Sequence, residues 1–190
     1  MKRTAFLMML GAALILGAIP ATAQQGRFTA AVVGGTQWNA GGHLDGDNTI
    51  GFQLGYNFLK HWAFQIEGTT SNPTPDTPQG VNLTVIPGSV DTADLLQISG
   101  NMVRFFPIKN TNWTPFVSAG IAWVDIDYNN PLYYANEDGI GWGLALGAGV
   151  HYELSRGSFA LGQVRWMSFA QPNMDSLQVI VGFGFGIGSK

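Results

Sequence analysis

The chain of 190 residues contains no cysteine, which excludes disulfide bonds, thiol chemistry and the cysteine-linked anchor of a lipoprotein. Charged residues are scarce as well, at 11% of the chain, whereas soluble domains contain roughly 25%. Beyond the N-terminal segment there is no apolar run of the roughly 18 residues that a transmembrane helix needs. A chain that is poor in charge but contains 26 glycines and 12% aromatic residues needs another way to pair its backbone in lipid. A closed β-barrel is the other structure that does so.

The N-terminal segment has the features of a Sec-type signal peptide. Lys2 and Arg3 form a basic start, an apolar stretch runs from Phe6 to Ile19, and Ala21-Thr22-Ala23 fits a small-x-small cleavage site. We therefore expect residues 1–23 to direct export. Without Lys2 and Arg3 the chain has seven basic against twelve acidic residues, a balance that argues against a nucleic-acid partner.

Alternation with a period of two predicts eight β-strands. From Thr49 to Phe58 every even position is large and apolar, and every odd position is small or polar. Helices do not produce this pattern, whereas strands with one apolar face do. The predicted strands are Arg27–Trp38, Thr49–Phe58, His61–Thr70, Leu95–Phe105, Thr114–Val124, Trp142–Leu154, Phe159–Ser168 and Leu177–Ile187.

The seventh predicted strand fits the alternation only if Phe159 and Leu161 face the interior. In that phase the two side chains would fill space left by inward-facing glycines on the neighbouring strands. A β-bulge near Gly162 is the alternative explanation.

The connections between these strands alternate in length. Short turns lie around Leu59-Lys60, Pro107–Asn112 and Ser155–Ser158, and longer connections span Asn39–Asn48, Ser71–Asp94, Asp125–Gly141 and Phe169–Asp175. Outer-membrane barrels combine short periplasmic turns with long extracellular loops. The sequence therefore predicts an all-β fold, an eight-stranded antiparallel transmembrane up-and-down β-barrel, with residues 24–190 as its one domain.

All six tryptophans fall near predicted strand ends, two at the short-turn end and four at the long-loop end. Amphipathic aromatic side chains form belts at the two membrane interfaces of such barrels. The predicted interface belt consists of Trp38, Trp62, Trp113, Trp123, Trp142 and Trp166.

Several motifs carry a family resemblance. They are Gly55-Tyr56-Asn57-Phe58 before the strand of Trp62, Asn101 and Phe105 before Pro107, Thr114–Gly120, and the closing alternation Val179–Ile187. With these motifs the chain resembles the OmpA-type and opacity-type small outer-membrane β-barrel family. The resemblance implies the cell outer membrane of a Gram-negative cell and insertion by the barrel-assembly machinery. One departure is that the family's last strand usually ends the chain in an aromatic residue, whereas this chain continues through Gly188-Ser189-Lys190.

The few charges inside the predicted strands have both signs. Glu67 and Glu153 are acidic, Arg165 and Arg27 are basic, and His151 faces the interior beside Glu153. An inward charge in a narrow barrel must be paired, because desolvation without a partner is costly. We expect these residues to form an ion-pair network that closes the lumen. A gated proton or ion path is the alternative for the charges, and catalysis is the alternative for His151.

Most acidic residues fall in the predicted long connections. They are Asp45, Asp47, Asp76, Asp91, Asp94, Asp125, Asp127, Glu137, Asp138 and Asp175. No Lys or Arg lies there, whereas Lys60, Lys109 and Arg156 lie at the opposite rim. Carboxylates two residues apart are a fragment of a Ca²⁺ loop, but the distal bidentate Glu is missing. We expect solvated loop charge, with divalent-cation bridging to lipopolysaccharide phosphates as the alternative.

The number of strands limits the functions that the interior of the barrel can have. Eight strands enclose just enough space for side chains, which argues against a general diffusion porin. We expect a structural or surface-interaction protein that contacts outer-membrane lipid, lipopolysaccharide and an extracellular ligand through acidic loops, without catalytic residues, cofactor or metal. One alternative is a small channel or carrier for apolar molecules, in room left by the inward glycines. The other is a lipid A-modifying enzyme, although no His–Ser pair lies on an outward face near the outer rim. A soluble lipocalin-like barrel is excluded, because its outward face would carry Lys and Glu.

Overall fold

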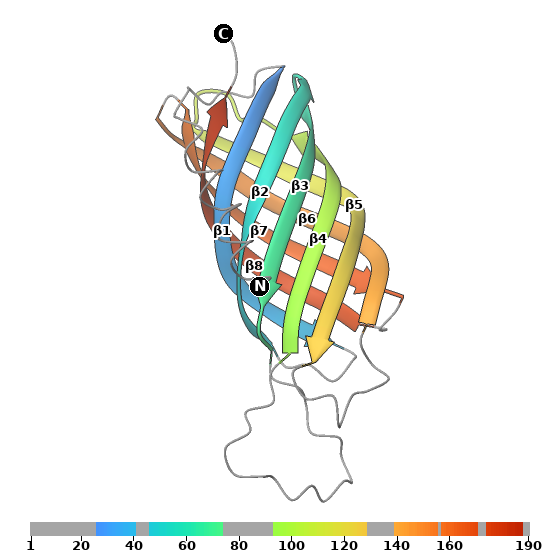
Figure 1. Ribbon diagram of the computed structural model, residues 1–190. Helices are drawn as coiled ribbons and strands as arrows, with labels where there is room; N and C mark the ends of the chain where they lie inside the picture. The colour runs from blue at the N-terminus through green and yellow to red at the C-terminus, as the bar shows by residue number, and fades with distance from the viewer. Residues whose placement is uncertain are drawn as a thin grey trace, which may run out of the picture.

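The computed structural model describes residues 26–40, 46–73, 93–128, 139–155, 157–170 and 174–187. These ranges contain eight strands that form one closed barrel (Figure 1). Every strand is antiparallel to both neighbours, and β8 closes the barrel on β1. The strands are β1 (Arg27–Ala40), β2 (Asp47–Leu59), β3 (Trp62–Ser71), β4 (Ala93–Phe105), β5 (Trp113–Tyr128), β6 (Gly139–Ser155), β7 (Ser158–Phe169) and β8 (Met174–Ile187). The predicted eight-stranded up-and-down barrel is confirmed.

The two rims of the barrel differ in their connections. The β2–β3, β4–β5 and β6–β7 hairpins turn at one end, where β1 begins and β8 finishes, and we call this end the short-turn rim (top of Figure 1). We call the opposite end the long-loop rim. Within the described ranges, no helix is long and apolar enough to cross a bilayer. The predicted signal peptide, residues 1–23, and most residues of the predicted long connections lie outside these ranges.

Side chains alternate between a buried inward face and an exposed outward face along each strand. On β2, Gln53 is buried, whereas Ile50 and Leu54 are exposed apolar side chains. On β7, Phe159 and Leu161 are only 5% and 4% exposed, so both face inward as the alternation predicted. The pairing of β7 with β6 and β8 continues in register through Gly162, so the alternative of a bulge there is wrong.

The strands extend farther at the long-loop rim than the sequence predicted. Five acidic residues that we placed in loops lie within strands instead: Asp47, Asp94, Asp125, Asp127 and Asp175. The predicted ends marked where the apolar alternation stops, but backbone pairing does not require an apolar face and continues past that point. The other acidic residues of the predicted loops, Asp45, Asp76, Asp91, Glu137 and Asp138, lie outside the described residues.

Candidate functional site

A layer of polar side chains crosses the middle of the lumen. Its members are Gln37, Gln53, Glu67, Thr69, Gln97, Ser99, Gln163, Arg165 and Gln178, which we call the central polar layer. All nine are buried, and they come from β1, β2, β3, β4, β7 and β8. Because inward positions recur every second residue, each strand can deliver its polar side chains to the same depth of the lumen. The layer therefore joins six strands across the interior.

The centre of this layer is a contact between Glu67 and Arg165. The Oε1 atom of Glu67 lies 2.8 Å from Nη1 of Arg165, and their side chains are 0% and 2% exposed. β3 and β7 are not neighbours, so the contact crosses the lumen. The two atoms are close enough for an ion pair, but Glu67 Oε1 does not accept a hydrogen bond in this geometry. Two buried charges of opposite sign at this separation offset part of each other's desolvation cost.

Arg165 also donates hydrogen bonds to neutral members of the layer. Its Nη1 donates to the Ser99 hydroxyl at 3.2 Å, and its Nη2 donates to the Thr69 hydroxyl at 3.4 Å. A further bond runs from Nη2 to the side-chain carbonyl of Gln178. The guanidinium is thus held from β3, β4 and β8 at once, in addition to its contact with Glu67. A charged donor with several acceptors is fixed in position, because each charge-assisted bond is stronger than a neutral one.

Glutamines extend the layer to the remaining strands. The Gln178 amide donates to the side-chain carbonyls of Gln37 and Gln97, at 2.5 Å each. The Gln53 amide lies 3.4 Å from both Glu67 Oε2 and Gln163 Oε1. Our sequence reasoning singled out the charges and missed the glutamines. The signal for them was their placement at inward positions of predicted strands.

Apolar side chains fill the lumen on the long-loop side of the central polar layer. They form one cluster of Ala93, Leu95, Ala122, Val124, Ile126, Ala145, Met167, Phe169 and Met174, which we call the long-loop cluster. No member is more than 2% exposed. Protein interiors packed in this way contain few voids larger than a water molecule. A path through the barrel would have to pass this cluster and then the central polar layer.

Aromatic rings fill the lumen on the short-turn side. The His151 ring stacks on Phe159 with centroids 4.6 Å apart, and meets Phe116 edge-on at 4.9 Å. These rings occupy the room beside inward glycines: a methyl group at Gly184 would lie 2.5 Å from Phe159, and one at Gly149 would lie 2.6 Å from Phe116. The space that we considered for an apolar cargo is therefore occupied by the protein's own side chains at these positions.

The predicted lumen residues fall into separate groups. Arg27 is buried on β1 beside Gly186, and close enough to Glu153 for their charges to interact. Glu67 and Arg165 form the separate central contact. The described contacts of His151 are with aromatic rings, which contain no group able to exchange a proton with it.

All six tryptophans point away from the lumen. Trp123 and Trp142 lie directly opposite each other on β5 and β6, and Trp113 packs on Tyr152 with ring centroids 4.6 Å apart. Two tryptophans lie toward the short-turn rim and four toward the long-loop rim; the six are Trp38, Trp62, Trp113, Trp123, Trp142 and Trp166.

Charges outside the lumen are separated by sign in the described part of the chain. Lys60, Arg104 and Lys109 lie toward the short-turn rim, and the acidic residues on the outward faces of the described strands, Asp94, Asp125, Asp127 and Asp175, lie at the long-loop rim. There, Asp94 on β4 is directly opposite Asp127 on β5, and Asn72 donates a 2.6 Å hydrogen bond to Asp94. The described residues contain no group of three or more metal-ligating side chains.

Comparisons with known proteins agree with this architecture. A family model described as an outer membrane protein beta-barrel domain matches residues 9–185. Neisserial surface protein A has a TM-score of 0.62 at 12% identity, covering 85% of this chain and 97% of that one. The attachment invasion locus protein Ail of Yersinia pestis scores 0.58 at 15% identity, with 86% and 100% covered. OprG of Pseudomonas aeruginosa scores 0.57 at 14% identity, with 87% and 98% covered. A comparison with curated proteins finds no match.

Proposed function

Because the chain belongs to the outer membrane protein beta-barrel domain family, and is therefore an integral outer-membrane protein, we propose that its barrel is an anchor. In this proposal the anchor holds the long-loop rim at the cell surface, where it contacts lipopolysaccharide and extracellular ligands. Residues 1–23 would direct export, and the barrel-assembly machinery would insert the mature chain.

The observation that carries this proposal is the filled lumen. The long-loop cluster, the central polar layer and the aromatic rings around His151 follow one another along the barrel, and their side chains are largely buried. In the strands that the structure describes, the protein's own side chains thus occupy the lumen, which favours the outer surface and the rims for interactions. Outer-membrane barrels expose the long-loop rim to the outside of the cell.

The charge of that rim favours lipopolysaccharide as a contact. Asp94 and Asp127 face outward on neighbouring strands and are directly opposite each other, so two carboxylates lie close together on the outer surface of this rim. Lipopolysaccharide carries phosphates, so a divalent cation between phosphate and carboxylate would offset both charges. Ail of Yersinia pestis has been solved with the heparin analogue sucrose octasulfate. On an acidic rim, a polyanion of that kind would also need bridging cations.

Neutralising the rim tests this function. We expect Asp94→Asn/Asp127→Asn to weaken Mg²⁺-dependent binding of lipopolysaccharide to the refolded protein about tenfold. A hydrogen bond to a charged group contributes about 1.5 kcal/mol, and a loss of about 1.4 kcal/mol in binding free energy lowers the affinity tenfold. Asparagine keeps the acceptor that Asn72 uses. The control is Lys109→Gln at the opposite rim, which should leave binding unchanged. Equal binding by the double variant and the unaltered protein would refute the lipopolysaccharide contact.

The two alternatives have less support. An apolar carrier would use the apolar lining of the long-loop cluster, but those side chains are packed against one another, and the central polar layer lies on their short-turn side. A lipid A-modifying enzyme needs a reactive group on the lipid side near the long-loop rim. In the described ranges, His151 faces the lumen and His61 lies in a short turn. We therefore propose that the protein is not an enzyme.

A further inference from the structure

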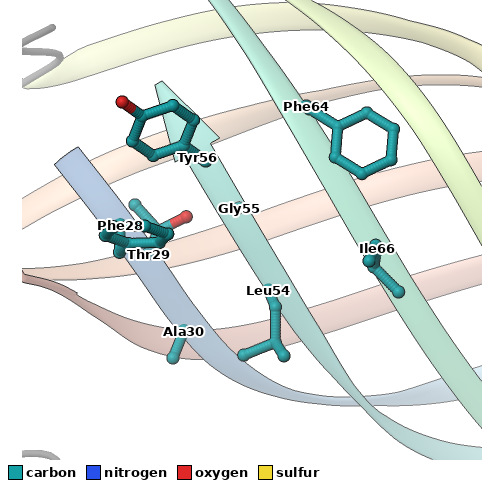
Figure 2. Close-up of a pocket in the computed structure, with 8 residues that line it drawn as sticks. All are labelled: Phe28, Thr29, Ala30, Leu54, Gly55, Tyr56, Phe64 and Ile66. Carbon is teal, nitrogen blue, oxygen red and sulfur yellow. The ribbon is translucent and has the colours of Figure 1, made fainter. Parts of the chain in front are cut away.

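The outward face of β1, β2 and β3 contains an apolar hollow close to the short-turn rim (Figure 2). Its volume is about 470 Å³, within the range of small-molecule sites. Two rows of side chains, each in register across the three strands, provide most of its lining. One row is Phe28, Tyr56 and Phe64, and the other is Ala30, Leu54 and Ile66.

The difference in size between neighbouring side chains creates the hollow. Phe28 and Tyr56 pack together with ring centroids 4.7 Å apart and form a wall on the short-turn side. The second row begins with the small Ala30 and continues from Ile66 to Gly100 on β4. The large rings of Phe28 and Tyr56 next to the small Ala30 leave a recess on the lipid-facing surface.

A positive charge lies beside this hollow on the same outward face. Arg104 on β4 pairs in register with Trp62, which precedes Phe64 by two residues on β3. The guanidinium carbon lies 5.0 Å from the Trp62 ring centroid and 5.8 Å from that of Phe106, so two aromatic faces hold it. Among the described residues, no carboxylate is within ion-pair distance of Arg104.

An arginine on the lipid-facing side of a barrel requires a compensating anion or water, because burying its charge in lipid is costly. At the short-turn rim the available anion is the phosphate of a membrane lipid, and guanidinium binds phosphate with two parallel hydrogen bonds. Lys60, exposed in the adjoining β2–β3 turn, adds a second positive charge at this edge. The hollow below Arg104 then receives an apolar chain of the same molecule.

We propose that this surface is a binding site for one anionic glycerophospholipid of the leaflet at the short-turn rim. Its phosphate binds Arg104, and one acyl chain lies in the hollow between the aromatic row and the Ala30–Leu54–Ile66 row. The site is at the opposite end of the barrel from the lipopolysaccharide contact proposed above, so either proposal can fail while the other holds.

Native mass spectrometry of the refolded protein in detergent tests this site with phosphatidylglycerol as the probe. We expect the unaltered protein to retain one phosphatidylglycerol at least about tenfold more tightly than a diacylglycerol with the same acyl chains, because the neutral lipid lacks the phosphate. Arg104→Gln should abolish this preference. Ala30→Trp should fill the hollow and weaken retention of both lipids.

Two control variants separate this site from general lipid contact. Lys109→Gln removes an exposed charge from the β4–β5 turn of the same rim, and Ala148→Trp adds a ring to the outward face of β6. Both should retain phosphatidylglycerol as the unaltered protein does. Equal retention by Arg104→Gln and the unaltered protein overturns the proposal, even if Ala30→Trp does not fold. The proposal is also overturned if Ala148→Trp weakens retention of phosphatidylglycerol as much as Ala30→Trp does. Displacement of the lipid by stoichiometric lipopolysaccharide would overturn it as well.

Discussion

Replacing Glu67 by Gln should lower the free energy of unfolding by about 3–5 kcal/mol, the cost of breaking a buried ion pair by removing one partner. Arg165 would keep its charge in the middle of the lumen, 2% exposed, without the carboxylate that now lies 2.8 Å away. The hydrogen bonds from Arg165 to Ser99 and Gln178 would remain, but neither acceptor carries a charge. Urea-dependent unfolding from phospholipid vesicles, followed by tryptophan fluorescence, measures this loss.

The double variant Glu67→Gln/Arg165→Gln should recover part of that stability, because it removes both charges together. Asp175→Asn provides a control for the loss of a carboxylate in general. Asp175 is exposed on β8 at the long-loop rim, and a substitution there should change stability by no more than about 0.5 kcal/mol. If the effects of Glu67→Gln and Arg165→Gln simply add, the two side chains do not stabilise each other.

Leu146→Arg should cost about 2–4 kcal/mol, the penalty for arginine on the lipid face at the middle of a bilayer. Leu146 lies near the centre of β6 with its side chain facing outward, 49% exposed in the absence of lipid. Ile140 provides a matched control, since it lies on the same strand and the same face, 65% exposed, but at the long-loop rim. Ile140→Arg should cost only about 0–1 kcal/mol near the interface.

Refolding into vesicles, with the folded fraction read from electrophoretic mobility, compares these two variants directly. A difference between them reports the depth of each position in the membrane, because strand, face and new residue are the same. Equal penalties at Leu146 and Ile140 would mean that the bilayer does not cover β6 as this account requires.

The strands and their outward faces could be predicted from the sequence because lipid imposes a strict alternation. In the segment Thr49–Phe58, a single residue out of phase would place an apolar side chain in the lumen and a polar one in lipid. The same argument favoured an inward orientation for Phe159 and Leu161, because Val164 and Arg165 fix the phase of the strand beyond Gly162. The register with β6 and β8, which runs unbroken through Gly162, then excluded the alternative of a bulge.

The strand ends at the long-loop rim could not be predicted in this way. Asp125 and Asp127 continue the β5 ladder, which pairs as far as Tyr128 with β4, although their side chains end the apolar pattern. Backbone hydrogen bonds do not depend on side-chain polarity. The apolar alternation therefore ends at the boundary of the lipid, whereas the strand continues beyond it.

Contacts across the lumen depend on the register of all eight strands, which a single sequence does not contain. Charges of opposite sign on inward faces indicated that Glu67 and Arg165 needed partners. Nothing in the sequence indicated that Gln178 would connect Arg165 to Gln37 and Gln97. The hollow beside Arg104 depends in the same way on the alignment of side chains from separate strands.

A planar-bilayer conductance recording on the refolded protein tests most directly the central claim that the lumen is closed. Among the described residues, the side chains of the long-loop cluster and of the central polar layer are buried in the lumen, so we expect the unaltered protein to produce no stepwise ion current at neutral pH. Glu67→Gln/Arg165→Gln should produce no current either, because the long-loop cluster beside the central polar layer is unchanged. A steady, voltage-stable current through the unaltered protein would contradict the account and identify the barrel as a channel.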